Sequence, residues 1–261
     1  MTGLRDAVVL LTGASGGIGT ATAHALARAG ARLSLAARRR EPLQALAREL
    51  HTRHGAAVHT ATVDVTDEDQ VRAWVQAAHQ HFGRVDVVIA NAGQYIRKPA
   101  LQWQVDDFQR SLAVNFYGAL HLVLAARPIF QAQRHGHIVL VSSLDAKKGL
   151  PLDGPYVAAK YALSGIGGVL RQELADLGIR VTVVYPGRVD TPMIADLEVP
   201  WISPKLPPER VARAIVRGIR RNRAEVIVPW TGYLLYLDLI APRLADYLVR
   251  KLNLAGRPRQ V

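Results

Sequence analysis

Short apolar runs alternate with longer segments of helical periodicity along most of this 261-residue chain. The runs are rich in Val, Ile and Leu and lack apolar–polar alternation, so they predict strands that are buried on both faces of a sheet. The expected strands are 7–11, 32–37, 57–63, 85–90, 137–142, 180–185 and 225–228, and the expected helices are 17–29, 41–54, 67–82, 104–134, 156–177 and 208–221.

This alternation of strands and helices predicts the class of fold. Successive βαβ units with right-handed crossovers wind a parallel sheet with helices on both faces. We therefore expect a single α/β domain, with a doubly wound parallel sheet of about seven strands, over residues 1–230.

Thr66, with Asp69 three residues later, is spaced to cap the third helix. Four prolines within nine residues exclude a continuous helix near 200–208, so 188–208 is the expected substrate lid.

Composition narrows the class of protein further. The chain has no cysteine, which excludes disulfides, cysteine nucleophiles and cysteine-based metal sites. Its nine histidines show no metal-ligand spacing, so no metal is expected. No targeting segment stands out, and no apolar run reaches the roughly 18 residues of a membrane span. These features predict a soluble, cytoplasmic protein.

The net charge of +12 is concentrated in the last quarter of the chain. Residues 201–261 contain twelve Lys or Arg against four Asp or Glu. A solvated basic face is the favoured interpretation; phosphate-bearing ligands, anionic membranes and nucleic acid are the alternatives. No recognition motif or aromatic-interleaved basic patch supports nucleic-acid binding, and none is expected.

Residues 231–261 form the expected C-terminal extension, which is both apolar and basic. Leucines and tyrosines recur in it near helical spacing, with cations between them. We favour packing of this extension on its own domain or on a partner subunit. Peripheral contact with an anionic membrane is the less favoured alternative.

A glycine-rich turn, residues 12–19, follows the first expected strand and opens the first expected helix. Glycines permit a sharp turn and a close approach to a pyrophosphate, while the helix N-terminus supplies free N–H groups and positive dipole character. The strand–turn–helix context is the one that this motif requires. The pattern predicts a dinucleotide site on a Rossmann fold.

The end of the second expected strand indicates which dinucleotide binds. An acidic residue there favours NAD, whereas an arginine accommodates the 2′-phosphate of NADP. Residues 36–40 are two alanines followed by three arginines. Arg38 is the best candidate to pair with the phosphate, and Ser15 is a candidate for a further hydrogen bond. The expected cofactor is NADP(H).

Tyr156 and Lys160 lie one turn apart on a predicted helix, and Ser143 precedes the tyrosine by thirteen residues. A tyrosine hydroxyl, with an ordinary pKa of about 10, is a poor base at neutral pH. A nearby ammonium favours the phenolate, which suits proton exchange with an alcohol or carbonyl oxygen. Such a pair is also common in purely structural helices, so its meaning depends on the other motifs.

Six motifs follow one another in order along residues 5–230: the glycine turn, Asn91-Ala92-Gly93, Asn115 within a helix, Ser143, Tyr156 with Lys160, and Pro186-Gly187 with Thr191. In this order and context they resemble the short-chain dehydrogenase/reductase (SDR) family, in its main Tyr-x-x-x-Lys branch. The resemblance implies a Rossmann fold that transfers hydride between NADP(H) and a carbonyl or secondary alcohol. The one mild variation is Ala90, where many members carry a second Asn.

The resemblance also implies a role for each matched residue. Tyr156 is the expected general acid/base, and Ser143 holds the substrate oxygen. Lys160 binds the nicotinamide ribose and lowers the pKa of Tyr156, and Asn115 holds a water behind Lys160. The expected cofactor-binding residues are Gly13, Ser15, Gly17, Ile18, Gly19, Arg38, Arg39, Asp64, Val65, Asn91, Ala92, Gly93, Tyr156, Lys160, Pro186, Gly187, Val189 and Thr191.

Apolar residues in or near the lid, including Met193, Ile194 and Trp201, favour a lipophilic small-molecule substrate. The expected protein is an NADPH-dependent oxidoreductase; the alternative is a non-catalytic NADP-binding regulator or scaffold. The resemblance further implies a homodimer or homotetramer. Gly165 and Gly168 would each cost a helix about 1 kcal/mol relative to alanine, which a tight subunit contact would offset.

Overall fold

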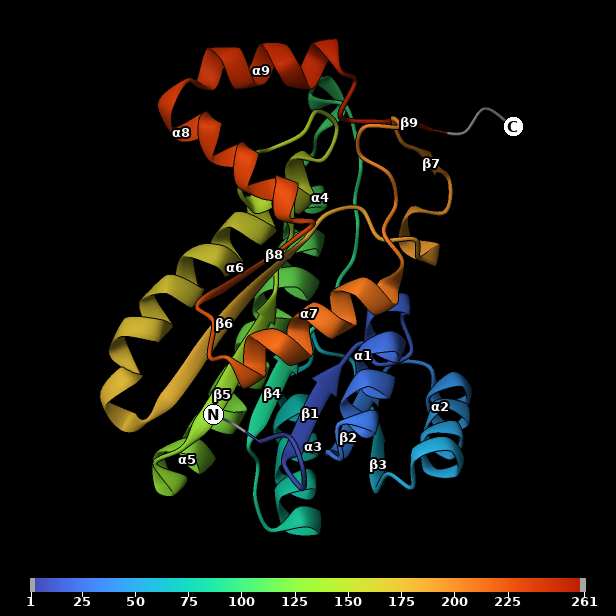
Figure 1. Ribbon diagram of the computed structural model, residues 1–261, viewed down its shortest axis with the longest axis vertical. Helices are drawn as coiled ribbons and strands as arrows, with labels where there is room; N and C mark the ends of the chain where they lie inside the picture. Colours follow the sequence, from blue (N-terminus) through green and yellow to red (C-terminus); the bar gives the residue numbers. More distant parts are fainter. Residues whose placement is uncertain (1–2, 259–261) are drawn as a thin grey trace.

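Seven parallel strands form the central sheet, in the order β3-β2-β1-β4-β5-β6-β8 (Figure 1). The structure is a computed structural model, and it describes residues 3–258. The strands of this sheet are β1 (Val8–Thr12), β2 (Arg32–Ala37), β3 (Val58–Thr62), β4 (Val87–Ala90), β5 (Gly136–Val141), β6 (Ile179–Pro186) and β8 (Glu225–Val228). A separate two-stranded antiparallel pair joins β7 (Leu197–Glu198) to β9 (Arg257–Pro258).

Helices cover both faces of the sheet, as expected for a doubly wound Rossmann fold (Figure 1). They are α1 (Gly17–Arg28), α2 (Arg40–His54), α3 (Glu68–Phe82), α4 (Val105–Leu112), α5 (Gly118–Gln133), α6 (Gly154–Glu173), α7 (Pro208–Arg220), α8 (Leu237–Ile240) and α9 (Pro242–Lys251). The predicted fold class is confirmed, and all seven expected strands are present.

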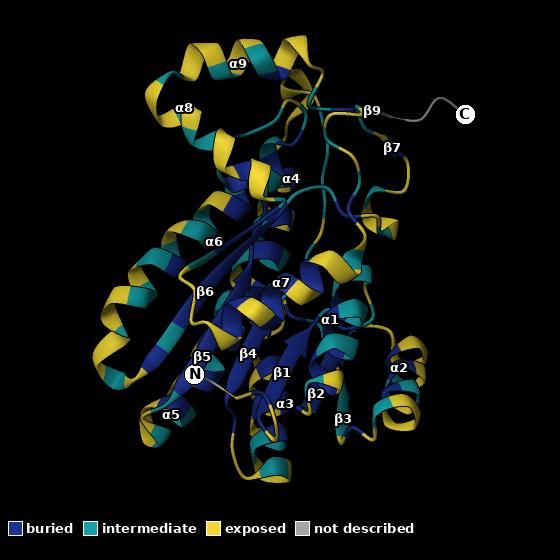
Figure 2. Cartoon of the chain, viewed as in Figure 1, coloured by how far each residue is buried: buried dark blue, intermediate teal, exposed yellow. Residues whose placement is uncertain are grey.

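Strand β1 shows why the apolar runs lacked alternation. Val9 and Leu11 join a core with residues of α1, α2 and α7, whereas Val8 and Leu10 join a second core with residues of α3, α5 and α6. All four side chains are fully buried, so each side of the strand must be apolar. Figure 2 shows the inner strands of the seven-stranded sheet as a buried layer between the two sets of helices, whereas the edge strand β3 is only partly buried, so the expectation of burial on both faces is wrong for β3.

Two local expectations are wrong in detail. Thr66 does not cap α3; the N-cap is Asp67, whose carboxylate accepts a 3.0 Å hydrogen bond from the Gln70 N–H, while the Thr66 hydroxyl donates to Asp64. The expected helix over 104–134 is divided into α4 and α5 by a π-helical segment, Ala113–Tyr117. An unbroken hydrophobic period does not reveal such a segment, because it inserts only one wider turn.

The long helical segment Val105–Gln133 has the length and apolar composition of a membrane span. The apolar side chains of α5, including Leu122, Val123 and Phe130, are instead buried against the sheet and α3. About a third of the most apolar stretch of this segment is buried in this way.

The C-terminal extension forms a cap, which we define as residues 230–256, beyond the carboxyl ends of the strands (red in Figure 1). It consists of a 3-10 segment, Trp230–Tyr236, followed by α8 and α9. Lys148 holds it in place, because its ammonium lies 2.6 Å from Asp238 and 2.5 Å from Asp246. Residues 259–261 of the extension lie outside the described residues.

Two arginines attach the end of the cap to the domain. Arg97 donates to the carbonyls of Ala255 and Gly256, at 2.8 and 3.0 Å, and Arg188 donates to the carbonyl of Leu254. The β7–β9 pair continues this attachment, so the lid and the chain end share one small sheet.

The glycines of α6 provide a test of its packing. A Cβ at Gly167 would lie 2.5 Å from Val183 Cγ2, whereas a Cβ at Gly165 would meet nothing within 4 Å. We expect Gly167→Ala to lower the free energy of unfolding by about 1–3 kcal/mol through overpacking. Gly165→Ala, the matched control, should raise it by up to about 1 kcal/mol through helix propensity when both variants are measured at a dilution where the protein is monomeric. Denaturant unfolding of both variants measures these changes, and equal effects would contradict the packing described here.

Candidate active site

The site begins where the strand order reverses, between β1 and β4. Thr12 ends β1, and its hydroxyl accepts hydrogen bonds from the N–H groups of Asn91 and Ala92 after β4, at 3.0 and 3.1 Å. The Asn91 amide donates in return to the carbonyls of Thr12 and Gly13. Crossovers leave the sheet in opposite directions from these two strands, so a crevice opens between them.

A cleft of about 740 Å³ lies along this crevice, beside the N-terminus of α1. It brings together most of the expected cofactor-binding residues: Gly13, Ser15, Gly17, Ile18, Gly19, Arg38, Arg39, Asp64, Val65, Asn91, Ala92, Gly93 and Thr191. The remaining five, Tyr156, Lys160, Pro186, Gly187 and Val189, line the adjoining cavity.

The glycine turn has the geometry that a pyrophosphate requires. Gly13 has a φ of +64°, and a Cβ there would lie 2.8 Å from Ala92 Cα. A Cβ at Gly19 would lie 2.1 Å from the Gly13 carbonyl oxygen, so only glycine allows the turn to pack on α1. The N-cap residue, Gly16, has no side chain to occupy the first N–H groups of α1. The residues present therefore fit a dinucleotide phosphate.

Two arginines supply positive charge where the cleft passes the end of β2. Arg38 and Arg39 follow β2, are exposed, and both line the cleft, and the Arg39 guanidinium lies 3.4 Å from the Ser15 carbonyl oxygen. Asp64 sits across from them after β3, where its carboxylate accepts hydrogen bonds from the N–H and hydroxyl of Thr66. No acid follows β2 at the position that would bind ribose hydroxyls.

A second cavity of about 890 Å³ continues from this cleft beneath the cap. Ser143, Tyr156, Lys160 and Asn115 all line it, so the structure brings the four expected catalytic residues together. The neighbouring Ser142 has a different use, because its hydroxyl donates to the Lys160 carbonyl at 3.0 Å. Ser143 therefore supplies the hydroxyl beside Tyr156.

Burial controls the charge of the central pair. Tyr156 is enclosed, and burial together with the nearby Asp145 carboxylate raises its pKa above the ordinary value, while the Ser143 hydrogen bond lowers it. Burial lowers the pKa of Lys160 to about 8. The Lys160 ammonium donates to the Val141 carbonyl at 2.9 Å and lies 5.5 Å from the Tyr156 ring centroid. The net direction of the Tyr156 shift is set by burial and by Asp145, so the expected lowering of its pKa by Lys160 stays a prediction.

Asn115 occupies the π-helical segment, which turns its side chain toward the cavity floor. Its amide donates to the carbonyls of Gln94 and Ser111, at 2.8 and 3.0 Å, and accepts from the Gln94 N–H at 3.2 Å. A Cβ at Gly93 would lie 3.0 Å from the Asn115 amide oxygen. Its role in holding a water behind Lys160 stays a prediction.

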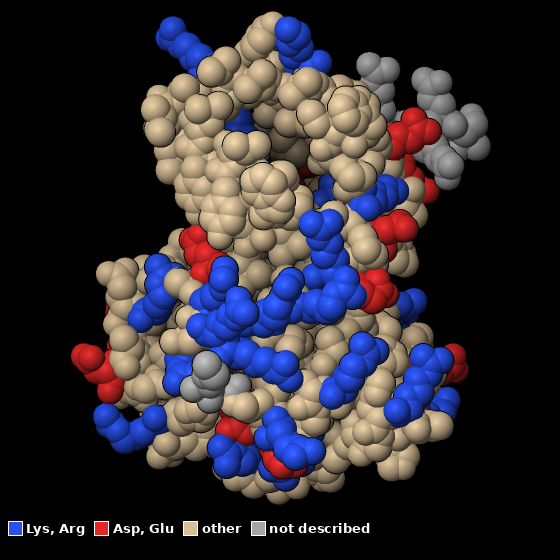
Figure 3. Space-filling model, viewed as in Figure 1, with Lys and Arg blue, Asp and Glu red and all other residues tan. Residues whose placement is uncertain are grey.

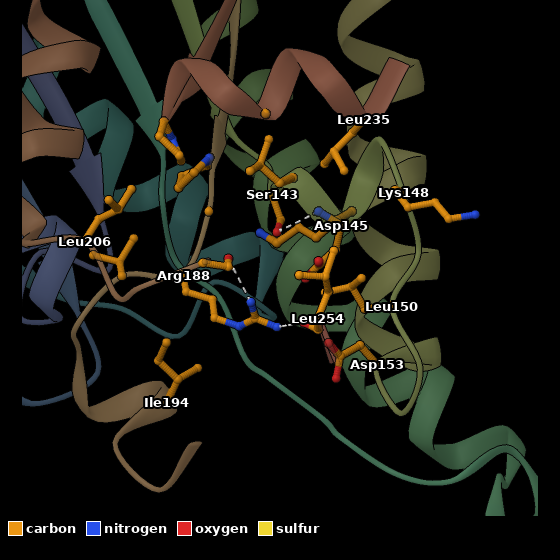
Figure 4. Close-up of a pocket in the computed structure, with 18 of the residues that line it drawn as sticks. Ser143, Asp145, Lys148, Leu150, Asp153, Arg188, Ile194, Leu206, Leu235 and Leu254 are labelled. Carbon is orange, nitrogen blue, oxygen red and sulfur yellow. Dashed lines mark hydrogen bonds between the residues drawn. The ribbon is translucent and has the colours of Figure 1, made fainter. Parts of the chain in front are cut away.

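Sequence reasoning missed a charged cluster beside Tyr156. Asp145, Asp153 and Arg188 line the cavity, and Figure 4 shows the Arg188 guanidinium turned toward the side that carries both carboxylates. Tyr95 donates to Asp153 at 2.7 Å, and its ring packs edge-on against Tyr156 with 5.1 Å between centroids. Two positions in the sequence could have indicated this cluster: Asp145 lies two residues after Ser143, and Arg188 comes directly after Pro186-Gly187.

Most of the remaining wall is aliphatic. It is built by the loop after β5, the lid and the inner side of the cap (Figure 4). These residues are Leu144, Leu150, Met193, Ile194, Leu197, Ile202, Leu206, Leu234, Leu235, Leu237, Leu248, Val249, Leu252 and Leu254. The cavity therefore combines a polar floor at Ser143 and Tyr156 with a deep apolar body. Within residues 3–258, no cluster of His, Asp and Glu is arranged to hold a metal ion.

Comparisons with known proteins identify the family. A model of the short chain dehydrogenase family matches residues 7–199. An uncharacterised oxidoreductase of Staphylococcus aureus is 36% identical over 219 residues, covering 84% of this chain and 93% of the relative. The structure of an alcohol dehydrogenase from the archaeon Thermococcus sibiricus, complexed with 5-hydroxy-NADP, matches with a TM-score of 0.78 and 29% identity, covering 86% of this chain and 96% of its own.

A third comparison extends the similarity in fold. A short chain dehydrogenase/reductase from Burkholderia phymatum, in complex with NAD, has a TM-score of 0.85 at 24% identity, over 94% of this chain and 97% of its own. The chain belongs to the short-chain dehydrogenase/reductase family. It is an oxidoreductase of the type that acts on CH–OH or C=O groups.

The Asp145 carboxyl should make folding stability depend on pH. Burial and the neighbouring Asp153 raise its pKa from 3.8 to about 7 in the folded protein. The folded state then holds this proton more tightly than the unfolded state, so stability falls as pH rises from about 4 to about 7. We expect Asp145→Asn to stabilise the protein at pH 8, by up to about 4 kcal/mol, and to have little effect near pH 4.

Denaturant unfolding at both pH values measures this difference. Asp196→Asn, an exposed lid residue, is the matched control and should change nothing at either pH. A stabilisation by Asp145→Asn of equal size at pH 4 and pH 8 would contradict a raised pKa.

Proposed function

We propose that this protein is an NADPH-dependent reductase of lipophilic carbonyl compounds. The observation that carries the proposal is the position of the Tyr156 hydroxyl, beside Ser143, at the floor of an apolar cavity that opens into the dinucleotide cleft. A carbonyl oxygen on that floor meets a proton donor and a hydrogen-bonding hydroxyl together. The preference for NADPH, the lipophilic substrate and the direction of reaction are parts of this proposal.

Arg38 and Arg39 support the choice of NADP(H). Both line the cleft after β2, where guanidinium groups would pair with a 2′-phosphate. When bound, the nicotinamide supplies the hydride, and the glycine turn would hold the pyrophosphate. Lys160 would bind the ribose next to the nicotinamide, and Pro186, Gly187, Val189 and Thr191, which line the adjoining cavity, would cover the nicotinamide.

Tyr156 is in the protonation state that reduction requires. Its pKa does not fall below the ordinary value, so the hydroxyl stays protonated at neutral pH and can donate its proton to a carbonyl oxygen. Ser143 donates a second hydrogen bond to that oxygen and steadies the developing negative charge. The pKa of Lys160, about 8, lies close to neutral pH. Lys160 can therefore supply a new proton to Tyr156 after the tyrosine has donated its own.

The shape of the cavity supports a lipophilic substrate. The aliphatic wall encloses a volume suited to a drug-sized or acyl molecule, and desolvation of such a molecule is favourable. The cluster of Asp145, Asp153 and Arg188 beside the floor would receive a polar group near the carbonyl.

Because the cysteine-free chain suits a reducing compartment, we place this activity in the cytoplasm.

The outer face of α6 supports the proposed homodimer or homotetramer. Gly165 and Gly168 face open space, and Tyr161 and Val169 on the same helix are 43% exposed. Residues 161, 165 and 169 share one face of the helix at a spacing of four, so they form a flat apolar strip that suits close packing of a second helix. A monomer at micromolar concentration would contradict this part of the proposal.

Removal of the Tyr156 hydroxyl tests the catalytic role. We expect Tyr156→Phe to lower kcat with NADPH and lipophilic ketones or aldehydes by roughly 10²–10⁴-fold, the usual contribution of a positioned general acid. Binding of NADPH, followed by its fluorescence, should be retained. Tyr161→Phe, one turn away and exposed, is the matched control. Tight NADPH binding without turnover of any carbonyl by the wild type would favour the regulator or scaffold instead.

The two arginines after β2 test the choice of cofactor. We expect the double variant Arg38→Ala/Arg39→Ala to raise KM for NADPH by roughly 10–100-fold, the value of one or two charge-assisted hydrogen bonds, and to leave KM for NADH nearly unchanged. Arg40→Ala is the matched control, because Arg40 begins α2 and does not line the cleft. A wild type that uses NADH as well as NADPH would contradict the preference.

A further inference from the structure

The cap is apolar on both of its sides. Its inner side lines the cavity with Leu235, Leu248 and Val249. Its outer side leaves other large apolar side chains in solvent: Leu239 is 79% exposed, Ile240 86% and Tyr247 50%. A helix at the surface of a soluble domain normally turns a polar face outward, so an element that is apolar on both sides requires a second apolar neighbour.

The exposed side chains form one surface rather than scattered single residues. Figure 3 shows the part of the molecule that contains the cap as a nearly continuous uncharged surface, hollowed in the middle, with cations at its outer end. Its exposed apolar residues are Trp230, Tyr233, Leu234, Leu237, Leu239, Ile240, Leu244, Tyr247 and Leu252. Contiguous apolar patches of this kind mark interaction sites.

The mouth of the cavity opens within this surface. Trp230, Leu234 and Leu252 are exposed and also line the cavity, as do Met193 and Ile202 from the lid. Because the same side chains meet both solvent and the cavity, they form its rim. A molecule that leaves through this rim therefore passes through the apolar surface.

Charge indicates what covers the surface. The cap has two acids, Asp238 and Asp246, and both are paired with Lys148. Its cations, Arg243, Arg250 and Lys251, all lie on the exposed side of α9. The cap thus presents apolar residues flanked by a net positive charge, which is the pattern of elements that lie at the surface of an anionic bilayer.

We propose that the cap is a docking surface for an anionic membrane. Leu239 and Ile240, at the turn between α8 and α9, insert at the level of the acyl chains, and the cations of α9 contact the headgroups. Trp230 and Tyr233 lie at the interface, where amphipathic aromatic rings are favoured. In this orientation the cavity mouth faces the lipid, so an apolar molecule passes between bilayer and cavity without crossing water.

A second copy of the chain is the competing occupant of this surface. Face-to-face packing of two caps would bring together the three cations of each copy, and of the two acids of the cap only Asp246 lies near one of these cations, Arg250. The chain also offers α6, a strip without this charge, for self-association. These features favour the membrane, and the experiment below distinguishes the two occupants.

Co-sedimentation of the full-length protein with lipid vesicles tests the proposal. We expect binding to vesicles that contain phosphatidylglycerol, little binding to pure phosphatidylcholine, and a loss of binding as salt is raised. The double variant Leu239→Asp/Ile240→Asp should weaken binding at least 10-fold. Arg243→Gln/Arg250→Gln/Lys251→Gln should weaken it by roughly 100-fold on anionic vesicles, since each cation contributes near the surface.

Leu101→Asp is the matched control, because Leu101 is fully exposed and lies outside the cap. It should leave vesicle binding unchanged, and thermal unfolding verifies that each variant is folded. Absence of wild-type binding, or binding that survives Leu239→Asp/Ile240→Asp, would overturn the proposal. Wild-type oligomers that dissociate in that variant, without vesicle binding, would assign the surface to a second copy. None of these measurements needs turnover, so their failure is separate from failure of the proposed reductase activity.

Discussion

The hydrogen bonds between Thr12 and residues 91–92 hold together the two strand ends between which the sheet reverses its order. The glycine turn leaves from one of these ends, and Gly93 leaves from the other toward Asn115 and the Tyr156 helix. Both parts of the candidate site adjoin this junction, so it fixes where the cleft beside the glycine turn lies relative to Ser143 and Tyr156.

Burial then shifts the pKa values of the residues at the floor of the cavity. Asp145, Tyr156 and Lys160 are all enclosed, and enclosure moves each of them toward its neutral form. With a pKa of about 8, Lys160 still carries its charge for most of the time at neutral pH, whereas Asp145, with a pKa of about 7, is only partly ionised there. Burial thus reduces the charge of the floor without removing it, and it leaves the Tyr156 hydroxyl protonated.

Much of the fold and of the site was predictable from the sequence. Buried strands reveal themselves as unbroken apolar runs, and the glycine turn and the Tyr156–Lys160 spacing are local patterns. What escaped prediction depends on tertiary contacts: Tyr95, Asp153 and Arg188 come from separate loops and meet only in the folded chain. Helical spacing in the C-terminal extension likewise identified one apolar face. It did not show that the other face is apolar too, because part of that face comes from the 3-10 segment and from the turn between α8 and α9.

Lys148 lies in the same loop as Ser143, and its ammonium is bound to two acids of the cap. The cap and the loop that carries Ser143 are thereby tied together by a buried cation, and Lys147 of the same loop adds a contact to the Tyr236 ring of the cap, 5.0 Å from its centroid. The height of the cavity roof and the position of the Ser143 hydroxyl are therefore set by one group of contacts rather than independently.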